Sequence, residues 1–283
     1  MKIVFFGTPK IAADILESLA KTKFNPQLVI TGEDSAAGRG RKITETPVKI
    51  VAKKHAVKTL EPQNLDNKGF VKELKDFAPD VAILVAYGKI IPDEILQIPK
   101  FGFVNIHPSL LPKYRGPSPI ISAILNGDKI TGSTVIVLDS ELDHGPIIAQ
   151  AQLSISDTDT HDSLANKLAN LGSKLIIKTL PAYLDQNITP QAQDHNLATY
   201  TEKVTKQNGE IDLENSPDPQ TLDRMIRAYY PWPTVWFELT GKKIKLLPEN
   251  KIQPEGKKPM TIKEFSNGYP MVRSVLEKLF PTH

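Results

Sequence analysis

Residues 1–20, MKIVFFGTPKIAADILESLA, decide the fold class of this chain. The apolar run Lys2–Phe6 predicts a buried strand that Gly7 ends. Thr8 is placed to cap a helix, and Pro9 suits the first helical turn because its fixed φ is already helical. Apolar residues then recur at helical spacing: Ile11, Ile15, Leu16 and Leu19. The stretch therefore predicts a strand, a turn and a helix in succession.

The same alternation continues along the first half of the chain. Further strands are expected over five apolar runs: Gln27–Thr31, Asp80–Ala86, Phe101–Ile106, Gly132–Leu138 and Ile147–Leu153. Helices are expected over Thr46–Ala56, Phe70–Phe77, Pro119–Asn126 and about Thr160–Leu180. Strands that alternate with helices predict an α/β fold with a Rossmann-like, doubly wound and mostly parallel sheet.

The turn after the first strand lacks the glycine fingerprint of dinucleotide-binding proteins. Only Gly7 stands where G-x-G-x-x-G would let the backbone approach a pyrophosphate, which argues against NAD or FAD. The basic segment Gly32–Thr44, GEDSAAGRGRKIT, has the wrong glycine spacing for a P-loop, and no Lys-Ser or Lys-Thr pair follows. We expect it to be a mobile loop, either solvated, which its composition favours, or in contact with a phosphate backbone.

The composition and the periodicity of the sequence change after Asp185. The stretch NITPQAQDHNLATY is polar and without period, as linkers are, so we expect domains over 1–186 and 203–283 joined by a linker over 187–202. The second domain is expected to contain a helix over Pro219–Tyr229 and a hairpin of two strands, Val235–Leu239 and Lys243–Leu247.

The composition excludes several classes of protein. A chain of 283 residues has room for about two domains, and 40% hydrophobic with 24% charged residues is typical of a globular protein. The absence of cysteine excludes disulfides, thiolate nucleophiles and cysteine metal sites. No apolar run reaches the roughly 18 residues of a membrane span, and the first residues are too short for a signal peptide. A cytoplasmic protein with no membrane partner is therefore expected.

Candidate catalytic groups lie at the end of the strand expected over Phe101–Ile106. Asn105 and His107 are two residues apart, so their side chains share a face if the strand extends to His107. An amide donor beside an imidazole can hold a developing oxyanion and move a proton. The prolines and the glycine of PSLLPKYRG, residues 108–116, predict a loop after this strand. Loops at strand ends are where α/β proteins place their catalytic and binding residues.

A structural role fits Asn105 and His107 equally well when they are taken alone. The segment ELDHGP, residues 141–146, changes that balance, because it follows the strand expected to end at Leu138 and should emerge at the same edge of the sheet. Asp143, if it lay beside His107, would orient the imidazole for proton transfer. An Asn, a His and an Asp at adjacent strand ends form a site suited to acyl-type transfer.

Three motifs resemble those of the 10-formyltetrahydrofolate-dependent formyltransferases: Asn105-x-His107 with SLLPKYRG, the downstream ELDHG, and the opening MKIVFFGTP. In that superfamily the Asn-x-His pair and the later Asp are shared by glycinamide ribonucleotide, sugar-nucleotide and methionyl-tRNA formyltransferases, so they indicate the reaction and not the acceptor. Other segments are similar to the methionyl-tRNA branch, and the likeness covers nearly the whole chain: AAGRGRKITETPVKI, VAYGKIIP, RMIRAYYPWPTVWFEL and IQPEGKKPMTIKEF.

The resemblance implies a set of functional residues. Asn105, His107 and Asp143 would be catalytic, and no metal is implied. The co-substrate 10-formyltetrahydrofolate would bind beside Val85, Ala86, Tyr87, Gly88, Ser109, Leu110, Leu111, Pro112, Leu138 and Asp139. Initiator methionyl-tRNA would be the acceptor, and Arg39, Arg41 and Lys42 would contact it. His144 is expected to be a spectator, and the protein a monomer.

Two other functions stay open at this point. A sugar-nucleotide N-formyltransferase would share the three catalytic residues, and a non-catalytic RNA-binding protein could use the same fold. The C-terminal domain also departs from the family's pattern, because a few dozen residues are missing between Leu247 and Lys251. We therefore expect a small β-rich, OB-like domain in abbreviated form, which would bind tRNA.

Overall fold

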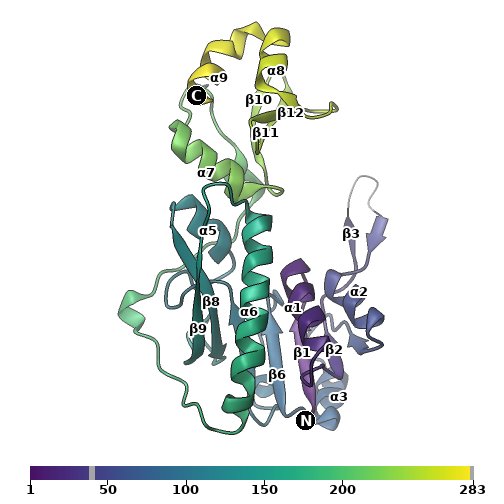
Figure 1. Ribbon diagram of the computed structural model, residues 1–283. Coiled ribbons are helices and arrows are strands. Elements are labelled where there is room, and N and C mark those ends of the chain that lie inside the picture. The colour runs from purple at the N-terminus through teal and green to yellow at the C-terminus, as the bar shows by residue number, and fades with distance from the viewer. Residues whose placement is uncertain (38–41, 281–283) are drawn as a thin grey trace. The chain divides into compact units, whose positions relative to one another are not determined.

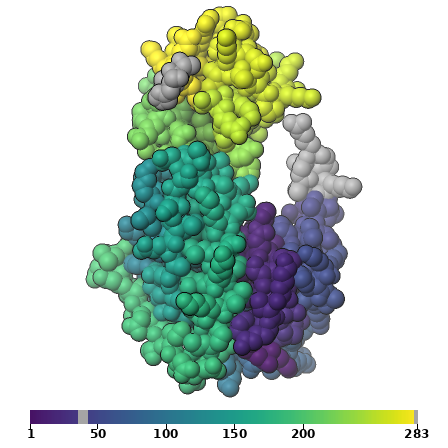
Figure 2. All heavy atoms as spheres, viewed as in Figure 1, coloured from purple at the N-terminus to yellow at the C-terminus, as the bar shows by residue number. Residues whose placement is uncertain are grey.

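The computed structural model describes residues 1–37 and 42–280, and the remaining residues are grey in Figures 1 and 2. The chain forms two compact units that interleave along the sequence. Unit 1 consists of Met1–Pro117, Thr131–Leu153 and Ala165–Thr201, and unit 2 consists of Ser118–Ile130, Ser154–Leu164 and Glu202–His283. The expected division into 1–186, 187–202 and 203–283 stays a prediction. Within the described residues, no helix is long and apolar enough to cross a membrane.

A seven-stranded sheet forms the centre of unit 1. Its strands lie in the order β5 (Lys58–Leu60), β2 (Leu28–Ile30), β1 (Ile3–Gly7), β6 (Val81–Val85), β7 (Phe103–His107), β8 (Ile130–Val137) and β9 (Ile147–Ser154). The first five strands are mutually parallel, and β8 is antiparallel to β7. The order of connection reverses between β1 and β6, which in doubly wound sheets is where a ligand-binding crevice opens. The Rossmann-like, mostly parallel sheet is confirmed.

Helices cover both faces of this sheet (Figure 1). On one face Ile3 and Phe5 of β1 belong to a buried cluster with α1 (Lys10–Ala20), α2 (Pro47–Lys54) and α6 (His161–Leu184). On the other face Val4 and Phe6 belong to a second cluster with α3 (Lys68–Phe77) and α4 (Asp93–Leu96). Because successive side chains of a strand point to opposite faces, an apolar run such as Ile3–Phe6 is needed to bury both.

Local details of unit 1 differ from expectation. Residues 32–44 contain two short antiparallel strands, β3 (Ser35–Ala37) and β4 (Lys42–Thr44), where a loop was expected. Backbone hydrogen bonds hold such a ribbon, so it needs no apolar pattern. Thr8 does not cap α1, whose N-cap is Pro9; the Thr8 hydroxyl donates to the Tyr87 carbonyl at 3.3 Å instead.

The C-terminal part of unit 2 is small and rich in β-structure. Strands β10 (Val235–Leu239), β11 (Lys242–Leu247), β12 (Lys251–Pro254) and β13 (Met260–Thr261) form an antiparallel sheet in chain order. The unit also contains α5 (Pro119–Leu125), α7 (Pro219–Tyr229), α8 (Ile262–Gly268) and α9 (Arg273–Leu279). The small β-rich domain expected from the sequence is confirmed, as a four-stranded meander.

A tight hairpin turn joins β11 and β12, at the place where the sequence led us to expect missing residues. Strands β11 and β12 pair through Leu247 and Lys251, with only residues 248–250 between them. Glu249 and Asn250 take left-handed backbone conformations, with φ of 61° and 52°. Left-handed residues are what tight hairpins use, so the shortened connection closes without breaking the sheet.

Candidate active site

Strand β7 places Asn105 and His107 on one face of the sheet. The strand extends to His107, as the sequence argument required, and its neighbours Val104 and Ile106 point to the opposite face, into the cluster with α1 and α6. Both polar side chains are buried, with 5% of Asn105 and 4% of His107 exposed. They are therefore held rigidly and largely shielded from solvent.

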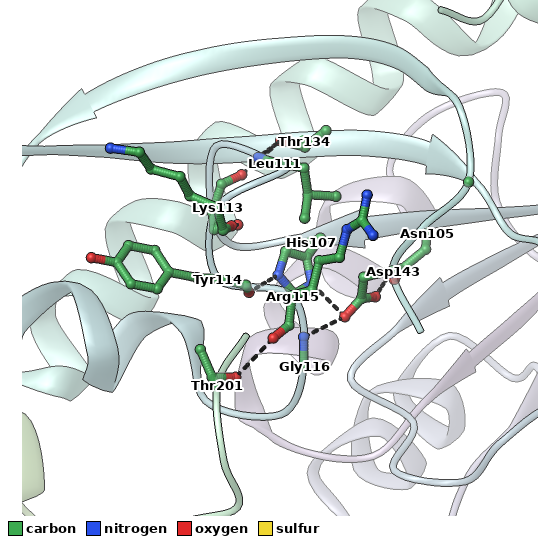
Figure 3. A network of polar contacts seen from close by, with 12 residues as sticks. Asn105, His107, Leu111, Lys113, Tyr114, Arg115, Gly116, Thr134, Asp143 and Thr201 are labelled. Atoms are coloured by element: carbon green, nitrogen blue, oxygen red, sulfur yellow. Dashed lines mark hydrogen bonds and ion pairs between the residues drawn. The ribbon is translucent and has the colours of Figure 1, made fainter. Parts of the chain in front are cut away.

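Asp143 meets both side chains (Figure 3). Its Oδ1 accepts a hydrogen bond from Asn105 Nδ2 at 3.2 Å, and its Oδ2 accepts one from the Gly116 backbone N–H at 2.8 Å. The same Oδ2 lies 3.6 Å from His107 Nδ1. The structure thus brings together the three residues that the sequence singled out.

The reason given for this meeting was wrong, although the meeting itself occurs. Because β8 is antiparallel to β7, with His107 opposite Thr134 and Val104 opposite Val137, β8 ends near the beginning of β7 and not at its carboxyl edge. Asp143 reaches Asn105 because the loop after β8 lies over the polar face of β7. Strand direction was not readable from an apolar run alone.

The hydrogen bonds of His107 determine where its proton can move. His107 Nε2 lies 2.9 Å from the Tyr114 carbonyl oxygen. A carbonyl only accepts, so Nε2 carries a hydrogen. Proton exchange at this imidazole therefore takes place at Nδ1, the atom that faces Asp143.

A sharp turn holds Asp143 in place. Asp143 itself has a left-handed backbone, with φ of 48°. A Cβ built on Gly145 would lie 1.8 Å from the Val137 carbonyl oxygen, so the turn passes β8 at a distance only glycine allows. The Val137 N–H also donates to the Pro146 carbonyl at 2.9 Å, which anchors the end of the turn.

Replacing Gly145 by alanine should therefore displace the turn. We expect the free energy of unfolding to fall by about 1–3 kcal/mol, the usual range for overpacking, together with loss of activity. Urea denaturation measures the first effect. Gly268→Ala is the matched control, because its Cβ would meet nothing within 4 Å and no stability should be lost. A Gly145→Ala variant as stable and active as the parent would contradict this description of the turn.

A second layer of polar residues, not found from the sequence, supports the first. Arg115 donates from Nε and Nη2 to Gln193 Oε1, at 3.2 and 2.7 Å. Gln193 Nε2 in turn donates to the carbonyl oxygens of Asp143 and Gly145, both at 2.8 Å. Gln193 lies in the polar stretch that was expected to be a linker. Its burial could not be predicted there, because the stretch has no apolar periodicity.

That polar stretch lies along unit 1. Gln191 pairs with Ile147, and the Arg115 N–H donates to the Thr199 carbonyl at 2.8 Å. The Thr201 N–H donates to the Arg115 carbonyl at 2.8 Å. Backbone pairing of this kind needs no apolar side chains, which explains why composition alone suggested a linker.

The residues expected beside the folate lie in three segments. The first follows β6: Ala86 and Gly88 take left-handed conformations, with φ of 44° and 83°. Between them Tyr87 packs edge-on against Phe6, with ring centroids 5.4 Å apart. Burial raises the pKa of Tyr87 to about 12, and its buried hydroxyl has no hydrogen-bond partner among the described residues.

The second segment follows β7, and the third follows β8. Ser109 is fully buried and donates to the Lys113 carbonyl at 2.6 Å, which folds Leu110–Pro112 into a compact loop. Leu138 packs against the cluster that contains Tyr87, and Asp139 pairs with His144 Nδ1 at 2.7 Å.

Of the three residues expected to bind tRNA, Lys42 begins β4, whereas Arg39 and Arg41 lie outside the described residues. Among the described residues, no cluster of three or more His, Cys, Asp or Glu could hold a metal ion.

Comparisons with known proteins find relatives over nearly the whole chain. Residues 1–180 match the formyl transferase family, and residues 203–250 match the formyl transferase C-terminal domain. The methionyl-tRNA formyltransferase of Thermodesulfovibrio yellowstonii is 38% identical over 94% of this chain and 95% of its own length. That of Thermotoga maritima is 40% identical over 92% of this chain and 82% of its own length.

Solved structures share the fold at lower identity. A sugar N-formyltransferase from a Shewanella species superposes with a TM-score of 0.67 and 16% identity, over 87% of this chain and 96% of its own. HypX from Aquifex aeolicus, in complex with tetrahydrofolic acid, has a TM-score of 0.64 and 18% identity, over 87% of this chain and 37% of its own.

Proposed function

This chain belongs to the methionyl-tRNA formyltransferase family, and from that premise we propose that it transfers the formyl group of 10-formyltetrahydrofolate to the α-amine of methionyl initiator tRNA. The reaction supports the initiation of translation. One observation carries the proposal: Asp143 bonds Asn105 and lies 3.6 Å from His107, on a chain related to these enzymes over more than nine-tenths of its length. We expect a monomer that acts in the cytoplasm.

The three polar side chains have complementary tasks in this transfer. The methionine amine attacks the formyl carbon, and the electron pair of the C=O bond moves to oxygen. Asn105 Nδ2 carries two hydrogens, and one of them forms the hydrogen bond to Asp143. The other can stabilise the oxyanion, together with a proton on His107 Nδ1. Asp143 stabilises that charged imidazole and accepts the amine proton through a water. The oxyanion pair then re-forms the C=O bond as the N10–carbon bond breaks, and N10 takes up the proton that Asp143 accepted from the amine.

The three segments described above would hold the folate. They contain Val85, Ala86, Tyr87, Gly88, Ser109, Leu110, Leu111, Pro112, Leu138 and Asp139. Two features support this assignment. Strand β6 borders the point where the strand order reverses, and the Tyr87 hydroxyl is a buried donor that a polar ligand group could satisfy.

The basic residues Arg39, Arg41 and Lys42 would contact the tRNA acceptor stem, and the C-terminal domain would hold its backbone. Replacing Arg41 by alanine should raise KM for methionyl-tRNA several-fold and lower the salt dependence of tRNA binding by about one phosphate contact. The affinity for formyl-folate should not change. Lys72→Ala, which removes a lysine already paired with Asp76 on α3, is the matched control. Equal losses for both substrates would contradict a tRNA-contacting role.

One assay tests the function as a whole. The protein is incubated with 10-formyltetrahydrofolate labelled in the formyl group, and with either methionyl initiator tRNA or an amino-sugar nucleotide. Label is expected on the methionyl-tRNA only. Label on the sugar nucleotide would identify a sugar-nucleotide N-formyltransferase, and tRNA binding without any transfer would identify a non-catalytic RNA-binding protein.

A further inference from the structure

Arg115 is a buried cation with no carboxylate partner among the described residues. Only 2% of the residue is exposed. Its guanidinium donates to Gln193 Oε1, to His195 Nδ1 at 2.8 Å and to the Tyr200 hydroxyl at 3.3 Å. Burying a charge without a charged partner costs free energy. A task of Arg115 in the folded protein would explain why it is buried here.

The guanidinium fixes the orientation of the Gln193 amide. Arginine donates hydrogen bonds and never accepts them, so the Gln193 atom that faces Arg115 must be the oxygen Oε1. The amide nitrogen is thereby turned toward the carbonyl oxygens of Asp143 and Gly145. Both hydrogens of Nε2 are used, one for each carbonyl.

Arg115 and its neighbour Gly116 therefore both act on Asp143, Arg115 through Gln193 and Gly116 directly. Figure 3 shows the Gly116 contact. The Gly116 N–H binds the Asp143 carboxylate at 2.8 Å, while Arg115 holds the Asp143 carbonyl through Gln193. The left-handed backbone of Asp143 is unfavourable for a residue with a side chain, so bonds to its carbonyl and to that of Gly145 help to maintain it.

We propose that Arg115 and Gln193 are positioning residues, which hold the backbone of Asp143 so that its carboxylate stays in contact with Asn105 and within reach of His107. Neither residue needs to touch substrate for this. The inference rests on the proposed function for its kinetic consequence, but the arrangement of Asp143 and His107 can be measured without any reaction.

Gln193→Glu is the most discriminating variant. The glutamate keeps the length of the side chain and an acceptor for Arg115, with which it would form an ion pair. It loses both N–H donors and sets a carboxylate against two carbonyl oxygens. If Gln193 only anchored Arg115, this variant would be at least as good as the parent. If Gln193 positions Asp143, its replacement by glutamate should lower kcat roughly 10- to 100-fold and leave KM for both substrates unchanged.

The control and a second readout separate positioning from general damage. Gln191→Glu is the same substitution two residues away, and it should leave kcat unchanged. Within the described part of the chain, the Gln191 side chain donates to the Thr189 carbonyl and to no other group. In protein labelled with ¹⁵N-histidine, the His107 ring signals, identified by their absence in His107→Gln, should shift in Gln193→Glu and not in Gln191→Glu.

The outcomes are distinct. Unchanged kcat and unchanged His107 signals in Gln193→Glu would overturn the inference. A parent protein that transfers no formyl group to methionyl-tRNA would overturn the proposed function, while the ring signals would still test the positioning of Asp143. If Gln193→Glu does not fold, Gln193→Met carries the same expectation, because it keeps the side-chain length and also lacks both donors.

Discussion

Replacing Asp143 by asparagine should lower kcat by roughly 10²–10⁴-fold, the range that general acid–base groups contribute, in a protein that still folds. The substitution preserves shape but removes the negative charge 3.6 Å from His107 Nδ1. It also sets an amide nitrogen either against the Gly116 N–H or against Asn105 Nδ2, each of which is a donor. Loss of the negative charge destabilises the protonated imidazole of His107. The amine proton also loses the carboxylate that would accept it.

Single-turnover formyl transfer to methionyl-tRNA measures this effect free of product release. Glu141→Gln is the matched control, since it removes an exposed carboxylate from the same loop and should leave the rate unchanged. Near-normal turnover in Asp143→Asn would show that the three-residue site is wrongly assigned.

His107→Ala should have a comparable effect on kcat, because Asn105 alone would then face the oxyanion. The variant also leaves the Tyr114 carbonyl without the hydrogen bond that it accepts from Nε2 at 2.9 Å, which should cost about 1–3 kcal/mol of stability. His107→Gln can supply a donor to that carbonyl but cannot carry a proton. It should be more stable than His107→Ala and equally inactive.

The double variant of His107→Ala with Asp143→Asn tests whether the two residues act as a unit. Residues that share one task give non-additive losses, so the double variant should be about as slow as the slower single one. A loss equal to the product of the two single losses would mean that they contribute independently, against the mechanism proposed above.

The fold was largely predictable where a local pattern marks buried structure. The runs at Ile3–Gly7 and Val81–Val85 form central strands because their side chains are buried on both faces, and α1 follows from its apolar spacing. The edge strand β5, Lys58–Leu60, was not predicted, because its side chains are half-buried or exposed and leave no apolar run. Strand β8 was found, but its antiparallel direction was not, since direction is set by connection and packing.

For the site, the two-residue period of a strand was enough to predict that Asn105 and His107 share a face, on the condition that the strand extends to His107, because this period is a local property. It also indicated formyl transfer, through motifs that lie within single segments. The path by which Asp143 reaches them depends on the folded chain, and so does the contact between Arg115 and Gln193, which lie 78 residues apart. A hydrogen bond between distant polar residues leaves no periodic trace in the chain; it forms where the packing of apolar elements brings two polar groups together away from water.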